Sequence, residues 1–241
     1  MAGALIAVQE PMQMALPVTL PDDETFTSYF GGENSLEVSH LKDAFTKLSN
    51  KFQYTYLCGL GDSGKSHLLY ATCIHAQERG LSTMLLSMRE VIDYGPVVLE
   101  GLENLDVLCI DDVHLVAGND AWEKGLFNFF NRFNEPGKYL VVTADLLPDM
   151  LHINLPDLVS RLKWGTTLQI RSMSDDDKAE ALVRRAHMRG LELTDECARF
   201  LLTRLSRDMR ALLDVLDKLD HASMAAQRKL TIPFIKSTLK L

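Results

Sequence analysis

A glycine-rich stretch between residues 54 and 66 constrains the fold of this chain more than any other segment. Its first part, residues 54–58, is aromatic, β-branched and apolar, which predicts a buried strand. The strand pattern breaks at Gly59, and a helix is predicted from Lys65 to about residue 79. Residues 59–66 match the pattern Gly-x-x-x-x-Gly-Lys-Ser in the strand–turn–helix context of a phosphate-binding P-loop. The alternative is an ordinary glycine turn before a helix.

The chemistry of phosphate binding explains why these residue types occur at this spacing. Glycines let consecutive backbone N–H groups point at phosphate oxygens, and the N-terminus of the following helix adds partial positive charge. Lys65 is expected to reach the outer phosphates, and the Ser66 hydroxyl is expected to be a Mg²⁺ ligand. The predicted nucleotide-binding residues of this segment are Gly59, Gly61, Asp62, Ser63, Gly64, Lys65, Ser66 and His67.

Composition limits the partners that the chain can bind directly. A net charge of −8 over 241 residues argues against binding nucleic acid by bulk electrostatics, although a local basic patch stays open. The four cysteines form no Cys-x-x-Cys pair and the seven histidines lack metal-ligand spacing, so no structural metal is predicted. The apolar residues 2–8 are too few to span a bilayer. The expected location is the cytoplasm, with no membrane partner.

The pattern after the glycine-rich turn predicts further alternating strands and helices. The run at residues 105–111 is continuously apolar, as is typical of a parallel strand that is buried on both faces. Amphipathic helices are predicted from Ser35 and over residues 120–134. The other strands are expected at about residues 82–87, 138–143 and 167–170. This alternation predicts an α/β fold: a five-stranded parallel sheet with helices on both faces.

The pattern changes at about residue 171, after which only helices are predicted. Their expected starts are Ser174, Thr194 or Asp195, Ser206, and about Ile232. The sequence therefore predicts three parts: an extended tail at 1–22, an α/β base at 23–171 and a small all-helical lid at 172–241.

Acidic residues follow two of the predicted strands. Asp111 and Asp112 end the third strand, and Asp145 follows the fourth. Parallel strands deliver their C-terminal residues to the sheet edge where phosphates bind, so Asp111 can hold the Mg²⁺ water shell and Asp112 can orient an attacking water. The separation between Lys65 and Asp111, 111 − 65 = 46 residues, leaves room for one helix–strand unit. This suits the P-loop class in which another strand lies between the two motifs.

Two arginines allow both a structural and a functional interpretation. Arg161 is either a solvated surface residue or a group that projects toward the nucleotide of a neighbouring subunit, where its guanidinium neutralises charge on the phosphoryl group. Arg210 is either a solvated helix charge or a residue that folds back onto the chain's own nucleotide.

The first 22 residues are rich in proline yet apolar at alternate positions, which presents one apolar face of an extended strand. Such a segment either docks on its own domain or inserts into the groove of another protein. The pattern alone favours the first interpretation.

Together these motifs resemble the AAA+ family. Within it, residues 64–69, 109–112 and 208–213 are similar to the replication initiator DnaA. Residues 20–26, 155–162 and 226–234 resemble more closely the DnaA-homologous regulators that inactivate DnaA. By this resemblance the chain is expected to have no counterpart of the C-terminal helix-turn-helix domain with which DnaA reads DNA.

This resemblance implies a negative regulator of replication initiation. It implies that Gln13, Met14, Leu16, Pro17 and Val18 bind the sliding clamp of the replicative DNA polymerase, which would reverse the first interpretation of the tail. The clamp-bound protein would contact ATP-bound DnaA, and Arg161 would act in trans as an arginine finger. DNA would be contacted mainly through the clamp, and a homo-oligomer stays open.

The resemblance also implies that the chain's own site holds ADP or ATP with Mg²⁺ as a structural switch. Lys65, Ser66, Asp111, Asp145 and Arg210 would form this site. Strong ATPases of this class usually have glutamate where Asp112 stands, so weak hydrolysis is expected. The alternatives are a self-sufficient DnaA-like or DnaC-like ATPase that acts on DNA or loads a helicase, and a P-loop kinase of a small metabolite.

Overall fold

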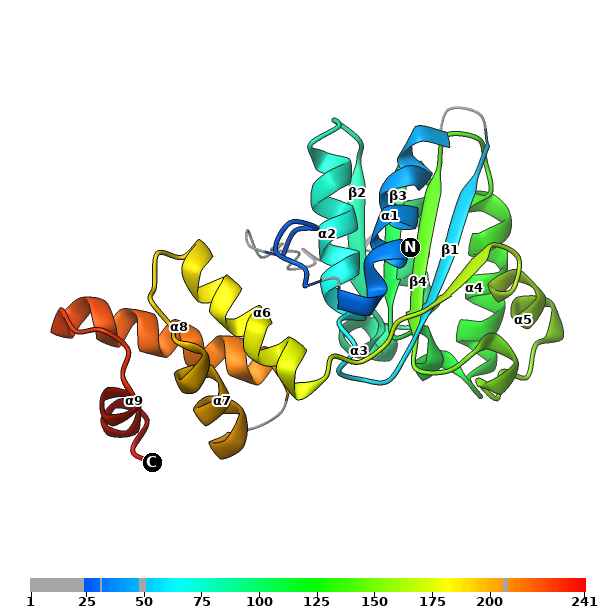
Figure 1. Cartoon of the computed structure of the whole chain (residues 1–241). Helices are drawn as coiled ribbons and strands as arrows, with labels where there is room; N and C mark the ends of the chain where they lie inside the picture. Colours follow the sequence, from blue (N-terminus) through cyan, green and yellow to red (C-terminus); the bar gives the residue numbers. More distant parts are fainter. Residues whose placement is uncertain (1–23, 31, 48–50, 206–207) are drawn as a thin grey trace, which may run out of the picture.

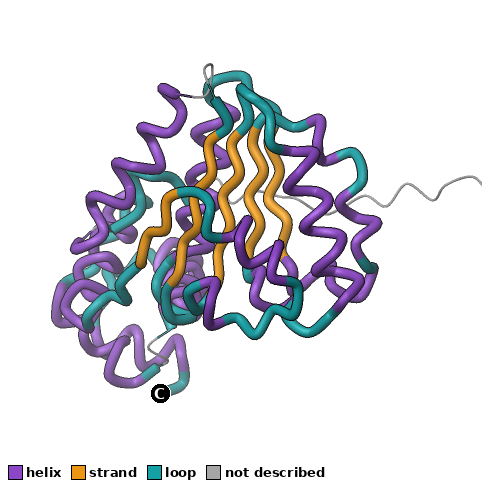
Figure 2. Tube along the Cα trace, turned by 90° about the vertical axis from the view of Figure 1, so that its right-hand side faces the viewer, coloured by secondary structure: helices purple, strands orange, loops and turns teal. Residues whose placement is uncertain are grey.

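The centre of the molecule is a five-stranded parallel sheet (Figures 1 and 2). The computed structural model describes residues 24–30, 32–47, 51–205 and 208–241, without the side chain of Arg210. The strand order is β2-β3-β4-β1-β5, and all neighbouring pairs are parallel. The strands are β1 Gln53–Cys58, β2 Thr83–Ser87, β3 Val107–Asp111, β4 Tyr139–Ala144 and β5 Thr166–Gln169. The predicted five-stranded parallel sheet is confirmed, with strand ends displaced by one or two residues.

The register places the end of β4 between the P-loop strand and the acidic strand. In β4, Thr143 lies beside Leu57 of β1, and Val142 lies beside Ile110 of β3. The additional strand expected from the spacing of the motifs is therefore present. It carries Thr143 and the following Asp145 into the space between the two motifs.

Helices cover both faces of the sheet (Figure 2). One face packs on α1 (Ser35–Ala44) and α2 (Lys65–Gln77), and the other packs on α3 (Met88–Val91), α4 (Asp120–Phe133) and α5 (Pro156–Leu162). Alternate residues of β1 enter the two cores: Tyr54, Tyr56 and Cys58 on the α4 side, and Leu57 on the α2 side. Short 3₁₀ helices occupy Gly32–Asn34, Phe45–Lys47, Ile92–Tyr94, Pro96–Leu99, Leu102–Asn104, Val113–Val116 and Pro148–Met150.

Four helices form the C-terminal lid, which lies beside the base in Figure 1. They are α6 Asp175–Met188, α7 Asp195–Arg204, α8 Met209–Ala226 and α9 Ile232–Leu239, and they share an apolar core of their own. Ser174 caps α6 as predicted, and Thr194, one of the two predicted starts, caps α7. No helix among the described residues is long and apolar enough to cross a membrane.

The predicted start of the third lid helix was wrong. Helix α8 begins at Met209, and its N-cap is Asp208, whose Oδ1 accepts a hydrogen bond from the Ala211 N–H at 3.0 Å. Ser206 lies outside the described residues. Serine and aspartate are nearly equivalent caps, so residue type alone gives Ser206 no advantage over Asp208.

A histidine on α2 packs between aromatic rings of the base. The ring of His75 meets Phe26 and Phe45 edge-on, with centroids 5.4 and 5.0 Å apart. Burial lowers the pKa of His75 below its ordinary value, the charge of Arg79 lowers it further, and Glu78 partly opposes the change. Folding therefore favours the neutral imidazole.

Folding stability is expected to fall as the pH drops below the ordinary histidine pKa of about 6.5. Because the folded-state pKa of His75 is lowered, the unfolded chain takes up its proton at a higher pH. The stabilisation is present above about pH 6.5 and is lost as the pH falls toward the folded-state pKa. A His75→Gln variant should lose less stability than the wild type on acidification in urea denaturation. Equal pH dependence in the two proteins would contradict this account.

Candidate nucleotide-binding site

The loop between β1 and α2 needs glycine at both ends of its motif. A Cβ on Gly59 would lie 2.4 Å from the Ile170 carbonyl oxygen and 2.9 Å from Ser63 Oγ. Gly64, the N-cap of α2, has a φ of +86°, and a Cβ there would lie 3.1 Å from the Tyr29 ring. Any side chain at either position would displace the loop.

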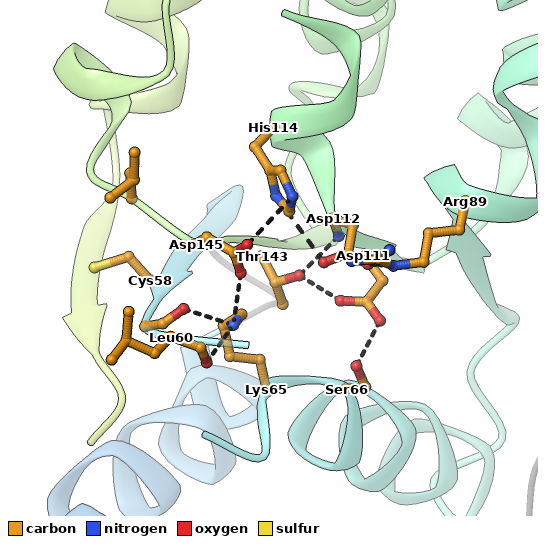
Figure 3. A network of polar contacts seen from close by, with 12 residues as sticks. Cys58, Leu60, Lys65, Ser66, Arg89, Asp111, Asp112, His114, Thr143 and Asp145 are labelled. Carbon is orange, nitrogen blue, oxygen red and sulfur yellow. Dashed lines mark hydrogen bonds and ion pairs between the residues drawn. The ribbon is translucent and has the colours of Figure 1, made fainter. Parts of the chain in front are cut away.

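Two polar groups of this loop are suited to phosphate. Ser63 Oγ is buried and has no hydrogen-bond partner among the described residues. Lys65 is only 4% exposed, and its Nζ donates to the carbonyl oxygens of Gly59 at 2.6 Å and Leu60 at 3.0 Å (Figure 3). A buried hydroxyl and a buried ammonium at the N-terminus of α2 are donors for an anion. The residues present therefore fit a phosphate group.

The sheet edge brings Asp111 to the start of α2. Ser66 Oγ donates a hydrogen bond to Asp111 Oδ2 at 2.7 Å, and Thr143 Oγ1 donates to Asp111 Oδ1 (Figure 3). Thr143 Oγ1 also accepts from the Asp112 N–H at 2.9 Å. The predicted pair of Mg²⁺-associated residues, Ser66 and Asp111, is thus in direct contact. A hydroxyl and a carboxylate are oxygen ligands of the kind that Mg²⁺ prefers.

Asp112 and Asp145 lie on either side of His114. Asp145 Oδ1 lies 3.2 Å from Lys65 Nζ, and its Oδ2 lies 3.4 Å from His114 Nε2. Asp112 has a φ of 58° and forms an ion pair with Arg89. Ligand atoms of Asp112, His114 and Asp145 lie within 4.8 Å of one another. The ion pair with Arg89 occupies the carboxylate that was predicted to orient an attacking water.

Sequence reasoning missed Arg89 and His114 and gave Thr143 no specific role. Arg89 lies in the short helix α3 after β2, and His114 lies in the 3₁₀ turn after β3, so both follow C-terminal strand ends. Their position at the sheet edge was a usable signal. The residues that Arg89 and His114 contact depend on the conformation of backbone turns, which the sequence pattern does not specify.

Asp62 links the P-loop to the lid. Its carboxylate forms an ion pair with Lys178 of α6, and its Oδ1 accepts a hydrogen bond from the Met209 N–H of α8 at 3.2 Å. The Lys178 side chain is 8% exposed, so the pair is partly shielded from solvent. The loop and two lid helices thus meet at one side chain.

The Asp62–Lys178 pair is expected to stabilise the lid–base contact by about 1 kcal/mol. Asp62→Asn keeps an oxygen that can accept from the Met209 N–H but removes the charge, and Lys178→Met keeps most of the apolar stem. The two single variants and the double variant form a cycle in which the free energy of unfolding is measured by urea denaturation. Strictly additive effects would contradict the contact.

The remaining predicted site residues are less closely connected. Gly61 borders open space. The His67 Nε2–H donates to the Thr25 carbonyl oxygen at 2.9 Å, and the His67 ring meets Tyr29 edge-on with centroids 5.2 Å apart. The side chain of Arg210 is outside the described part of the chain, although its residue lies in the first turn of α8, next to the residue that contacts Asp62.

Arg161 is not part of this network. It lies in the last turn of α5, where it contacts Phe127 and Trp164. The predicted clamp-binding residues Gln13, Met14, Leu16, Pro17 and Val18 lie outside the described residues.

Family models match most of the chain. The model described as the bacterial DnaA ATPase domain matches residues 20–169, which is more than half of the sequence. The chain belongs to the DnaA ATPase-domain family. A second model, described as the lid domain of Hda, matches residues 175–239. This is therefore an Hda-like, DnaA-homologous AAA+ protein, as the sequence motifs predicted.

Solved structures share the fold. Domain III of the replication initiation protein DnaA from Thermotoga maritima is 20% identical, with a TM-score of 0.73 over 92% of this chain and 98% of that one. AMPPCP-bound DnaA from Aquifex aeolicus is 23% identical, with a TM-score of 0.66 over 82% of this chain and 66% of that one. The Thermotoga maritima Holliday junction motor RuvB is 18% identical, with a TM-score of 0.65 over 90% and 71%. The AAA+ fold with a helical lid is thus confirmed.

Proposed function

We propose that the P-loop of this chain binds an adenine nucleotide with Mg²⁺. The buried, unpaired Ser63 hydroxyl, the enclosed Lys65 ammonium and the glycines that allow close approach of the backbone support this proposal. The solved DnaA of Aquifex aeolicus carries the ATP analogue AMPPCP, which agrees with an adenine nucleotide.

Each residue of the site has a distinct role in this proposal. Lys65 exchanges its loop carbonyls for the outer phosphates, while the loop amides and Ser63 hold the inner ones. Ser66 and Asp111 hold Mg²⁺, which supplies positive charge to the phosphates when it is bound. Asp62 transmits a displacement of the loop to α6 and α8, so that the nucleotide sets the position of the lid.

The chain's own site is proposed to hydrolyse ATP weakly. Asp112, the candidate for orienting water, is paired with Arg89, and Asp145 is held between Lys65 and His114. Both carboxylates therefore have cationic or imidazole partners. This suits a site that keeps its nucleotide as a conformational signal.

The main activity is proposed to be directed at another molecule. Arg161 lies on α5 outside the P-loop network, and no carboxylate in the described part of the chain pairs with its guanidinium. This single observation, together with the family match, supports an arginine finger that acts in trans on ATP bound to DnaA. The chain would thereby convert DnaA to its ADP form and limit replication initiation.

Residues 13–18 are proposed to direct this activity to replicating DNA by binding the sliding clamp. Gln13 would be the polar anchor, and Met14, Leu16 and Val18 would enter an apolar groove while Pro17 keeps the peptide extended.

The test compares phosphate release from ATP-bound DnaA with and without clamp loaded on DNA. The wild-type protein should accelerate release only when the clamp is present. A variant with both Leu16→Ala and Val18→Ala should lose clamp binding and stimulation together, whereas Leu20→Ala, just outside the motif, should retain both. If the wild-type protein never changes the rate of DnaA, the proposal is wrong.

A further inference from the structure

A tryptophan just beyond α5 lies against Arg161. The guanidinium carbon of Arg161 lies over the Trp164 ring, 4.9 Å from its centroid, and 5.9 Å from the centroid of Phe127 on α4. Asp157 and Ser160 of α5 complete a surface hollow of about 420 Å³. An arginine over an aromatic face within about 6 Å is held by a cation–π interaction, which is strongest with tryptophan.

This mode of holding leaves the hydrogen-bond donors of the arginine free. Asp157 lies one helical turn before Arg161 and lines the same hollow, yet the two form no ion pair in the structure. An acidic partner would occupy the N–H groups in the guanidinium plane, whereas an aromatic ring offers them no carboxylate oxygen. The in-plane donors therefore remain available for an external phosphate, which they can bind in bidentate fashion.

Trp164 itself is anchored to the strand that leads into the P-loop. The backbone N–H of Trp164 donates to the Arg161 carbonyl at 3.1 Å. The next residue, Gly165, lies so close to β1 that a Cβ there would be 2.2 Å from the Tyr54 carbonyl oxygen. The Tyr54 hydroxyl also donates to the Leu162 carbonyl at 3.1 Å, which fixes the end of α5. The backbone that carries the Trp164 ring is thus held between the end of α5 and β1.

We propose that Trp164 is a positioning residue. It orients Arg161 toward the phosphate of the nucleotide that the partner protein holds. This inference rests on the proposed function. By stacking on the guanidinium, Trp164 restricts the rotamers of Arg161 before the partner arrives, so less conformational entropy is lost in the transition state. It makes no direct contact with the nucleotide.

The contact itself can be tested without DnaA. The chain has two tryptophans, and Trp122 is 1% exposed whereas Trp164 is 52% exposed, so acrylamide quenching of the emission reports mainly on Trp164. Arg161→Ala should make the emission more readily quenched, because it uncovers the face of the ring. An unchanged quenching constant would overturn the contact, and with it the positioning role.

The role is tested with Trp164→Leu and Trp164→Phe in the DnaA hydrolysis assay with clamp on DNA. Leucine keeps apolar bulk without a π face, and phenylalanine keeps a weaker π face. Trp164→Leu should lower the maximal stimulated rate about five- to thirtyfold, with little change in the half-saturating protein concentration, and Trp164→Phe should recover most of the loss. Retained clamp binding and an unchanged melting temperature show that both variants are folded.

Two results would overturn the role. One is equal activity of the leucine and phenylalanine variants, and the other is a raised half-saturating concentration at an unchanged maximal rate, which would make Trp164 a docking residue. In both cases the wild type still stimulates DnaA and the proposed function stands. If the wild type fails to stimulate DnaA, the proposed function is wrong, and the positioning role is wrong with it. The quenching experiment still reports whether Arg161 and Trp164 are in contact.

Discussion

Arg161→Ala is expected to reduce the stimulated hydrolysis of DnaA-bound ATP to the unstimulated rate. Where arginine fingers have been measured in GTPases they contribute about 10³- to 10⁵-fold to the rate, because a fixed positive charge neutralises the phosphoryl group only in the transition state. Among the described residues this guanidinium has no acidic partner, and it lies over the Trp164 ring. Single-turnover phosphate release at saturating protein measures the effect.

The matched control is Lys163→Ala, two residues along the chain. Lys163 carries the same charge and is half-exposed, but it pairs with Asp149 at 2.8 Å instead of facing the hollow. Its substitution should leave stimulation within about twofold, since exposed ion pairs contribute little. Equal losses in the two variants would show that net positive charge near α5, and not a finger, explains the effect. Retained stimulation in Arg161→Ala would exclude the finger.

Lys65→Met is expected to weaken the binding of ATP and ADP by about thirtyfold to several thousandfold, the range for loss of one partner from an enclosed charged contact. Lys65 is the enclosed cation of the loop, and methionine replaces its stem without its charge. Binding of a fluorescent adenine nucleotide measures the affinity. Thermal denaturation provides a second readout, because a nucleotide at a hundred times its dissociation constant stabilises the folded protein by about 2.7 kcal/mol.

Lys124→Met serves as the control for Lys65→Met. Lys124 is an exposed residue of α4, away from the loop, and its substitution removes the same charge. This variant should bind nucleotide like the wild type. Unchanged nucleotide affinity in Lys65→Met, with a normal melting temperature in the absence of nucleotide, would contradict the role of the P-loop.

The fold could be predicted because its signals are local. The apolar run before Gly59, the glycine spacing and the acidic end of β3 each follow from short stretches of sequence. The separation of 46 positions from Lys65 to Asp111 even indicated that a strand would lie between the two motifs in space, and β4 does so. Sequence periodicity also separated the all-helical lid from the sheet.

The arrangement of the site could be predicted only in part. Ser66 and Asp111 were each expected at the Mg²⁺ site, and the structure brings them into contact. The hydrogen bond from Thr143 depends on the register of β4. The ion pair between Arg89 and Asp112 depends on a left-handed backbone conformation at Asp112. Such contacts join residues far apart in the chain through turn geometry, which no short pattern encodes.

The orientation of Asp62 shows the same limit. The motif placed this residue among the phosphate-binding group, and that role stays a prediction. The structure turns its carboxylate toward Lys178 and the start of α8. Only the packing of the lid on the base reveals this contact, because the partners lie 116 and 147 residues away in sequence.

The most direct test of the account is a single-turnover experiment with a labelled nucleotide. DnaA is first loaded with ATP labelled at its γ-phosphate, and this protein, clamp loaded on DNA and excess unlabelled ATP are then added together. The account predicts that labelled phosphate is released faster than from DnaA alone, and only when the clamp is present. The opposite result is release of labelled phosphate at the rate of DnaA alone while unlabelled ATP is consumed rapidly. That result would contradict the account and would identify the chain as a self-sufficient ATPase.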